Sequence, residues 1–438
     1  MASEQSATGV HATSQAAAHP PRSPLAAMEV DTRLVGMVAA LIIIWTGFHL
    51  FSDGAFLTPR NLWNLSVQTS SIAVMSTGMV LIIVTRNIDL SVGSVLGFIG
   101  MMMGVMQADV LPHFLGFEHP ATWVVTLAFG LVIGAVIGAL HGFVIAYMGV
   151  PAFIVTLGGL LVWRGAAWWV TSGRTVAPMD DTFRLMGGGV NGAIGDTASW
   201  VVAALACVAI VWATLHGRTQ RKRFGFPLKP VWAEFVVAGI ASAAVIGAVW
   251  IANSYYLPSR VAARYAETHG LEIPEGGSLL IAHGLPIPVL IAMGVGIVMT
   301  FITTRTRFGR YVFAIGGNPE AAELAGINTK RVRVLIFTTM GALCAIAGAI
   351  STARLNAATN SQGTLDELYV IAAAVIGGTS LGGGIGTVAG AMLGAVVMQS
   401  LQTGMVLMEV DTPLQNIVVG IVLVLAVWVD TVYRKRAK

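Results

Sequence analysis

Residues 122–148 read TWVVTLAFGLVIGAVIGALHGFVIAYM, a stretch without a single Asp, Glu, Lys or Arg. About 20 mostly apolar residues in a helix suffice to cross the hydrocarbon core of a bilayer. Four glycines recur at every fourth position, Gly130, Gly134, Gly138 and Gly142. This spacing places them on one helix face, where a neighbouring helix can approach closely. The stretch therefore predicts a tightly packed membrane-spanning helix.

Eleven further apolar runs occupy residues 34–51, 65–84, 92–106, 158–171, 199–215, 231–252, 286–302, 334–353, 369–378, 386–404 and 415–432. Hydrophobic residues make up 55% of the 438, and charged residues only 11%, against roughly 25% in a soluble protein. We expect an all-α polytopic membrane protein with about 10–12 transmembrane helices. Several runs, notably 369–378, are too short for a straight span, so we expect broken or re-entrant segments.

The glycine spacing recurs in the second half of the chain at Gly382, Gly386, Gly390 and Gly394. We favour close helix packing for both stripes; the alternative is that these helices line a transport path. The recurrence also indicates two related halves, an architecture common among transporters.

The Lys and Arg residues are distributed unequally between the two sides of the membrane. If every run crosses, 18 of the 25 Lys and Arg fall on one side: Arg22, Arg33, Arg86, Arg218, Arg221, Lys222, Arg223, Lys229, Arg305, Arg307, Arg310, Lys330, Arg331, Arg333, Arg434, Lys435, Arg436 and Lys438. Cytoplasmic loops carry such an excess. We predict a disordered cytoplasmic tail over 1–33, a transmembrane domain over 34–432 and a basic cytoplasmic tail over 433–438.

Several function classes are excluded by what the chain lacks. Its two cysteines cannot build a disulfide framework or a cysteine zinc site. No Lys follows a Gly, so there is no phosphate-binding loop, and any ATP hydrolysis must come from another polypeptide. No metal-ligand cluster or nucleophile–base pair stands out. We expect no catalytic residue, no metal and no cofactor.

The region 303–333 lies between two apolar runs and is predicted to form a cytoplasmic loop. Asn318 suits a helix N-cap, Pro319 the first helical position, and Glu320 the positive end of the helix. Gly326 suits a left-handed stop. We predict a short helix over 319–325, and favour a docking helix for a cytoplasmic partner over a solvated connection.

Asp89 lies in VTRNIDLSVGSVLG, residues 84–97. Charged residues near membrane depth are costly and usually functional or paired. Asp89 can cap a helix that starts near Ser91, and Gly93 would allow the backbone to bend. Capping and a role in the transport path remain compatible interpretations.

Arg164 falls inside the apolar run LLVWRGAAWW, residues 160–169. Snorkelling to the interface beside Trp163, Trp168 and Trp169 is the favoured interpretation. The alternative is that its guanidinium donates to sugar hydroxyls, to helix-end carbonyls or to an acid such as Asp89. The last candidate is a break in the apolar pattern at Gly377, Gly378, Thr379 and Ser380. A helix broken at membrane depth exposes backbone groups that can bind a polar substrate.

Five segments resemble the membrane permease subunits of bacterial ABC importers for monosaccharides. They are IDLSVGSVLG (88–97), PAFIVTLGGLLVWRGAAWWVTSGRTV (151–176), RFGRYVFAIGGNPEAAELAGI (307–327), AAAVIGGTSLGGGIGTVAGAMLGA (372–395) and IVVGIVLVLAVWVD (417–430). The resemblance implies a subunit in the bacterial inner membrane that pairs with a second permease subunit, in a homodimer or with a similar chain. It also implies a periplasmic sugar-binding protein and a separate ATP-binding subunit.

The residue patterns and the resemblance together give two sets of expected site residues. The ATPase-coupling loop comprises Gly317, Asn318, Pro319, Glu320, Ala321, Ala322, Glu323 and Gly326. The translocation path is expected at Asp89, Ser91, Gly93, Arg164, Gly377, Gly378, Thr379 and Ser380.

The sequence departs from the shorter ribose-type pattern at 216–285, where a basic loop, an extra span and a polar segment intervene. The longer form is expected of xylose-type permeases, so xylose or a similar pentose is the predicted substrate. Arg86 and Asn87 also replace the usual small residues before IDLSVG. The main alternative is an ion-coupled secondary sugar transporter, in which Glu234 or Asp430 would be the coupling carboxylate.

Overall fold

The computed structural model describes residues 32–116, 119–269 and 279–437. Within these ranges the chain is mostly helical, and its extended pairings are isolated bridges such as Val176 with Ala358. Ten segments of the described residues are long and apolar enough to cross a membrane. The predicted all-α polytopic membrane fold is confirmed.

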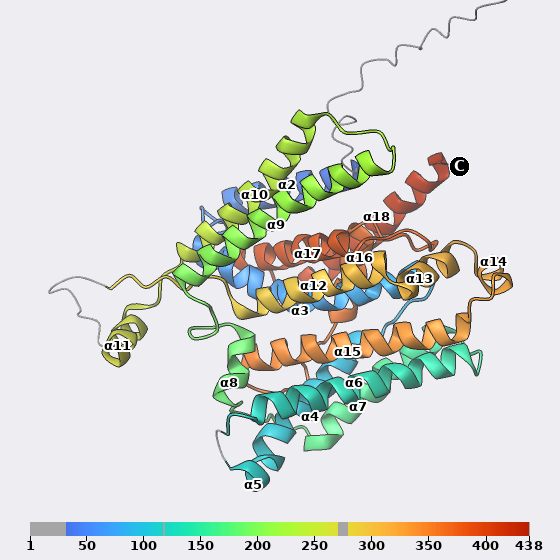
Figure 1. The fold of residues 1–438 in the computed structure, drawn as a ribbon. Coiled ribbons are helices and arrows are strands. Elements are labelled where there is room, and N and C mark those ends of the chain that lie inside the picture. The colour runs from blue at the N-terminus through green and yellow to red at the C-terminus, as the bar shows by residue number, and fades with distance from the viewer. Residues whose placement is uncertain (1–31, 117–118, 270–278, 438) are drawn as a thin grey trace, which may run out of the picture.

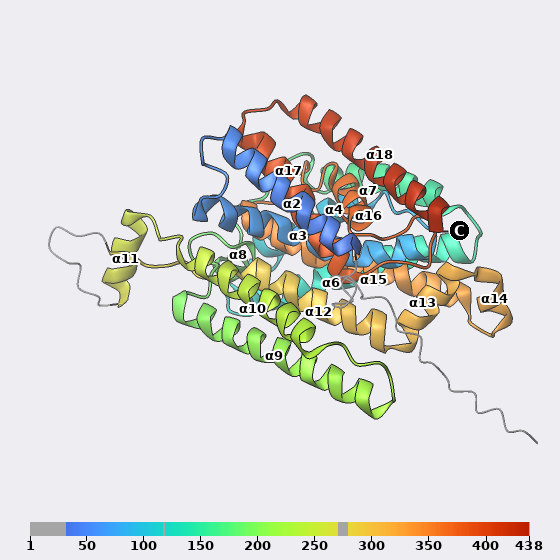
Figure 2. The same cartoon turned by 90° about the horizontal axis from the view of Figure 1, so that it is seen from above.

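These ten segments are α2 (Thr32–Phe51), α3 (Pro59–Val84), α4 (Val92–Val105) with the turns that follow it, α6 (Thr122–Ala146), α7 (Ala152–Thr171), α9 (Asp196–Arg223), α10 (Val231–Asn253), α12 (Ile287–Arg305), α15 (Thr329–Leu355) and α17 (Val388–Leu407). A π-helix (Met106–Val110) and α5 (Pro112–Leu115) extend α4. The last helix, α18 (Thr412–Ala437), lies along the surface of the bundle (Figure 2).

Helix α3 forms the centre of the bundle, and every residue from Thr69 to Val84 is buried. It contacts α12, α15, α16 (Asp366–Ile376) and α17, which lie around it in Figure 1. Neighbouring residues determine where α3 begins. Pro59 occupies its first position, and the Thr58 hydroxyl accepts a hydrogen bond from the Asn61 amide at 3.4 Å. The surrounding helices shield an apolar core that includes Met79, Ile99 and Phe337.

The run at 369–378 is broken, as predicted. Helix α16 has 11 residues, so it is about 16 Å long at 1.5 Å per residue, about half of the hydrocarbon thickness. The chain reaches its start through the non-helical residues 356–365, which lie against α4, and leaves through residues 377–387. Backbone that is not helical at this depth must be buried in protein or line a cavity.

The two ends of the bundle differ. Helices α5, α8 (Asp181–Arg184) and α11 (Ser259–His269) lie at one end of Figure 1, here called the far end. A 3₁₀ turn (Leu185–Gly187) follows α8. Helices α13 (Arg307–Gly317) and α14 (Pro319–Leu324), with the last turns of α18, lie at the other, here called the basic end.

The first glycine stripe packs α6 on α15, as favoured. A Cβ atom on Gly134 or Gly138 would collide with the carbonyl oxygen of Gly341 or Phe337. The second stripe was wrongly placed on one helix: Gly382 and Gly386 precede α17, which starts at Val388. The Thr387 hydroxyl caps α17 by accepting from the Gly390 amide at 3.1 Å, so the helix cannot include the earlier glycines.

The structure contains helices in three segments that were expected to be loops or tails. Of the basic residues assigned to a loop from 216, Arg218, Arg221, Lys222 and Arg223 instead belong to α9, which ends at Arg223, where cations favour the negative helix end. The region 303–333 holds α13 in addition to the predicted short helix. Residues 433–437 continue α18, while most of the predicted disordered tail, 1–31, lies outside the described residues.

Candidate functional site

The first candidate site is the short helix at the basic end. The predicted helix over 319–325 is observed as α14, Pro319–Leu324. The Asn318 side chain accepts a hydrogen bond from the Ala321 amide at 3.0 Å, and Gly326 has the left-handed φ of +81° that ends such a helix. Gly317 is the last residue of α13. Local capping residues therefore determine where α14 begins and ends.

The predicted contact residues on α14 differ in their exposure to solvent. Glu320, Ala321 and Glu323 are exposed, whereas Ala322 is buried and packs α14 against the bundle. Leu324 is 90% exposed, an unusual position for a large apolar side chain on a polar loop. The sequence interpretation missed Leu324, although it is the only leucine in this six-residue helix.

The second candidate site lies where the α3–α4 connection meets α6. Asp89 and Ser91 are buried, and Asp89 Oδ1 accepts from both the amide and the hydroxyl of Ser91, at 2.8 and 2.6 Å. Asp89 thus holds the turn that precedes α4 but does not cap the helix, because Ser91 is the N-cap residue and α4 has no side-chain cap hydrogen bond. Ser91 Oγ also lies 3.4 Å from His141 Nδ1.

Gly93 brings α4 against the broken segment. A Cβ atom there would collide with the Gly363 carbonyl and with Glu367 Oε2. The predicted bend at Gly93 is wrong, because α4 runs without interruption from Val92 to Val105. The absence of a side chain instead allows the start of α16 to approach α4 closely. Glu367 is buried there, and its Oε2 has no hydrogen-bond partner among the described residues.

Arg164 on α7 holds the segment that leads into α16. Its Nη1 donates to the carbonyl oxygens of Asn360 and Gln362, at 3.0 and 2.7 Å. Snorkelling is therefore the wrong interpretation, and Asp89 is not its hydrogen-bond partner. The Asn360 and Gln362 carbonyls belong to non-helical backbone, so no helix supplies them with a hydrogen-bond donor. Arg164 supplies that donor.

Gly377 to Ser380 lie at the opposite end of α16 from Gly93. Thr379 and Ser380 are fully buried, and Arg33 at the start of α2 donates to the Gly378 carbonyl at 3.3 Å. The predicted path residues therefore form two groups, joined by the length of α16, rather than one cluster.

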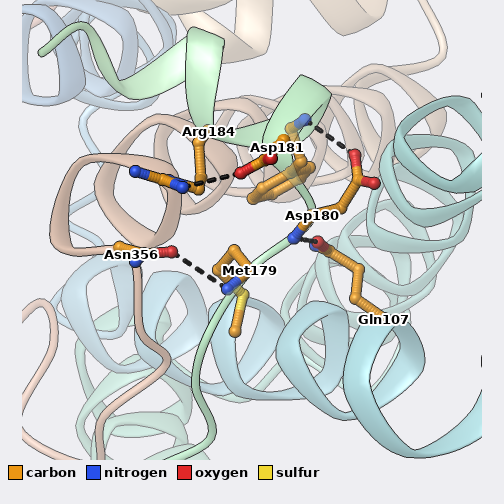
Figure 3. Close-up of polar contacts among 7 residues, drawn as sticks. Gln107, Met179, Asp180, Asp181, Arg184 and Asn356 are labelled. Atoms are coloured by element: carbon orange, nitrogen blue, oxygen red, sulfur yellow. Dashed lines mark hydrogen bonds and ion pairs between the residues drawn. The ribbon is translucent and has the colours of Figure 1, made fainter. Parts of the chain in front are cut away.

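The third candidate site is a polar cavity at the far end, of about 510 Å³, between the end of α4 and α8. Figure 3 shows polar contacts of several residues that line it, together with Asn356, which bonds to the lining residue Met179. Gln107 Oε1 accepts from the Asp180 amide at 3.1 Å, Asn356 Oδ1 accepts from the Met179 amide at 3.0 Å, and Arg184 pairs with Asp181 at 2.6 Å. The Gln107 amide nitrogen is buried without a partner among the described residues. Sequence reasoning did not find this cavity, because its residues come from segments far apart in the chain.

One protein family matches nearly the whole chain. Its model, described as branched-chain amino acid transport system / permease component, matches residues 61–231 and again 232–427. The chain belongs to this permease family. The double match supports the two related halves predicted from the glycine pattern.

Several relatives of this permease are named as sugar permeases. It is 39% identical to the xylose transport system permease protein XylH of Escherichia coli K12, over 92% of each chain. Identity is 37% to XylH of Haemophilus influenzae, over 93% of this chain and 98% of the relative. It is 31% to the ribose import permease protein RbsC of Escherichia coli K12, over 90% of this chain and 92% of the relative. No solved structure matched the chain.

This permease also has an apolar cavity of about 350 Å³ bordered by α2, α3, α10, α12 and α17. The hydroxyls that line it belong to Ser66, Thr69 and Ser70, and each donates to a carbonyl of its own helix at 2.7 to 2.9 Å. These donors are already used, so the cavity is poorly suited to a sugar.

Proposed function

We propose that the chain is the membrane-spanning permease subunit of an ABC importer for xylose. The observation that carries this proposal is the 39% identity to a xylose permease over 92% of both chains, against 31% to a ribose permease. The extra span predicted within 216–285 is observed as the helix α10, which agrees with the longer form expected of xylose-type permeases.

A separate ATP-binding subunit would dock at the basic end. This part of the proposal is supported by α14, which presents exposed Glu320, Glu323 and Leu324 on a capped helix. The concentration of Lys and Arg at this end supports its assignment to the cytoplasmic side. The far end, with its polar cavity beside α8, would then face a periplasmic sugar-binding protein, and both chain termini would be cytoplasmic in an inner membrane.

Transport would proceed by alternating access. ATP binding and hydrolysis in the partner move α14, and the core helices tilt so that the path beside α16 opens first to one side and then to the other. A ligand that binds both states equally shifts neither population. Selection of the sugar therefore rests largely with the binding protein. Two copies of the permease would form the complete channel, which mass measurement of the purified protein in detergent would test.

Reconstitution tests the function. The permease is placed in proteoliposomes with its ATP-binding subunit, and labelled xylose or ribose is supplied with a cognate binding protein. The expected result is xylose uptake that requires ATP and both partners, with little uptake of ribose. Uptake by the permease alone, driven by a proton or sodium gradient, would instead establish the secondary-transporter alternative. Glu234, a coupling suspect in that case, forms an ion pair with Arg218 at 2.8 Å.

A further inference from the structure

Arg86 joins two segments that are far apart in the sequence. It lies in the α3–α4 connection and adopts a left-handed φ of +62°, which costs a non-glycine residue free energy. Its Nε donates to the Gly316 carbonyl at 3.1 Å, and its Nη2 donates to the Gly317 carbonyl at 2.8 Å. These are the last two carbonyls of α13, which have no partner within the helix. The cationic guanidinium thus caps the negative end of α13.

The next residue after these carbonyls is Asn318, the N-cap of α14. Arg86 therefore holds the peptide immediately before the proposed docking helix. A rigid-body movement of α14 that displaces Gly317 must either carry Arg86 with it or break both hydrogen bonds.

A third segment meets the same point. The Gly384 amide, from the connection after α16, donates to the Val84 carbonyl at 2.9 Å. A Cβ atom on Gly316 would collide with the Val84 carbonyl oxygen and lie 2.7 Å from the Gly384 amide nitrogen, and one on Gly383 would lie 2.7 Å from the Gly316 carbonyl oxygen. Three backbones thus pack without intervening side chains, so they are expected to move together.

The connection continues from Arg86 into the polar core. Ile88 O accepts from the Thr156 hydroxyl of α7 at 3.3 Å, and Asp89 holds the turn before α4. Displacement of Arg86 therefore reaches α4, α7 and the exit of α16 through direct contacts.

Resting on the function proposed above, we propose that Arg86 is the positioning residue that transmits movement of the ATPase-docking helix α14 to the core helices. Its side chain is exposed at the basic end. Removing it should therefore leave the buried core folded while it uncouples the two parts.

The test uses the complete transporter in proteoliposomes, with wild type, Arg86→Gln, Arg86→Lys and Arg310→Gln. Arg310 is an exposed arginine of α13 and controls for lost charge at this end. Three quantities are measured: ATPase subunit retained on the purified permease, ATP hydrolysis stimulated by xylose-loaded binding protein, and xylose transported per ATP.

Arg86→Gln is expected to retain the ATPase subunit while xylose transported per ATP falls at least about fivefold, the lower end of typical coupling between sites. Arg86→Lys should recover part of the loss, and Arg310→Gln should resemble wild type. The inference is overturned if Arg86→Gln transports as many xylose molecules per ATP as wild type, or if transport falls only in proportion to lost ATPase subunit. Failure of the wild type to transport xylose would defeat the proposed function instead.

Discussion

The indole Nε1 of Trp163 on α7 donates a hydrogen bond to Nε2 of His141 on α6, at 3.0 Å. An indole nitrogen can only donate, so His141 Nε2 accepts and the imidazole proton of the neutral ring resides on Nδ1. That nitrogen faces Ser91 Oγ, which in turn donates to Asp89. The four side chains form one directed chain of donors that joins α7, α6 and the start of α4.

Replacing Trp163 with Phe tests this chain. Phe keeps an aromatic ring beside Phe98, whose centroid lies 5.1 Å from that of Trp163, but removes the donor to His141. A buried acceptor is then unsatisfied, which costs about 1–3 kcal/mol. We expect a lower melting temperature in detergent. Trp169→Phe, on the exposed side of the same helix, should change it little; equal effects of the two changes would contradict the directed chain.

Leu324 is expected to be an anchor for the ATP-binding subunit. Leu324→Ser removes most of an exposed apolar side chain without touching the Asn318 cap. We expect the affinity for the ATPase subunit to fall about tenfold, which corresponds to 1.4 kcal/mol. Leu324→Met should retain most of the affinity, and binding of the Ser variant at wild-type strength would show that the partner contacts another surface.

Features coded by neighbouring residues could be predicted from the sequence. Asn318, Pro319 and Gly326 determine α14 through local hydrogen bonds and backbone preferences, and the short run at 369–378 indicated the break at α16. Helix α13 was missed because its two arginines, Arg307 and Arg310, and the basic residues on either side of it suggested a loop. The spacing of Phe308, Val312 and Ile315 would have indicated an amphipathic helix, with Val312 and Ile315 fully or nearly buried.

Contacts between distant segments could not be predicted in the same way. Arg164 donates to carbonyls that lie 196 and 198 residues further along the chain. The residues next to Arg164 in the sequence do not distinguish this arrangement from snorkelling, because both place the guanidinium among polar groups. The far-end cavity was likewise hidden, since Gln107 and Asp180 meet only after the helices have packed.

Gly138 tests the packing of α6 on α15. Adding one methyl group with Gly138→Ala pushes a Cβ atom into the Phe337 carbonyl and the backbone of Thr338. Overpacking of this kind typically costs about 1–3 kcal/mol, so thermal stability should fall. Gly165→Ala is the matched control, because no heavy atom lies within 4 Å of its added Cβ. If both variants have the melting temperature of the wild type, the close approach of α6 and α15 contributes little to stability.

Mild acid should loosen the far end through His283. Burial lowers the pKa of His283 below its usual value of 6.5, and the neutral ring stacks on Tyr255 with centroids 4.3 Å apart. Between the folded pKa and 6.5 the unfolded chain binds more protons, so stability falls as the pH drops through this range. Melting temperatures between about pH 7.5 and 5.5 should show the decline, and His283→Phe should reduce it. An unchanged pH profile in that variant would assign the decline to other groups.

Arg164 should matter more to transport than to insertion in the membrane. Arg164→Met keeps an unbranched apolar side chain in α7 but leaves the Asn360 and Gln362 carbonyls without this donor. Hydrogen bonds from a charged group are worth about 1.5–3 kcal/mol each, so the segment before α16 should leave its position against Gly93 and Gly97. We expect xylose uptake to fall more than about tenfold, since 1.4 kcal/mol already corresponds to that factor. Arg60→Met, at an exposed arginine near the start of α3, is the control. Because Met cannot donate, uptake by Arg164→Met equal to that of this control would remove Arg164 from the transport path.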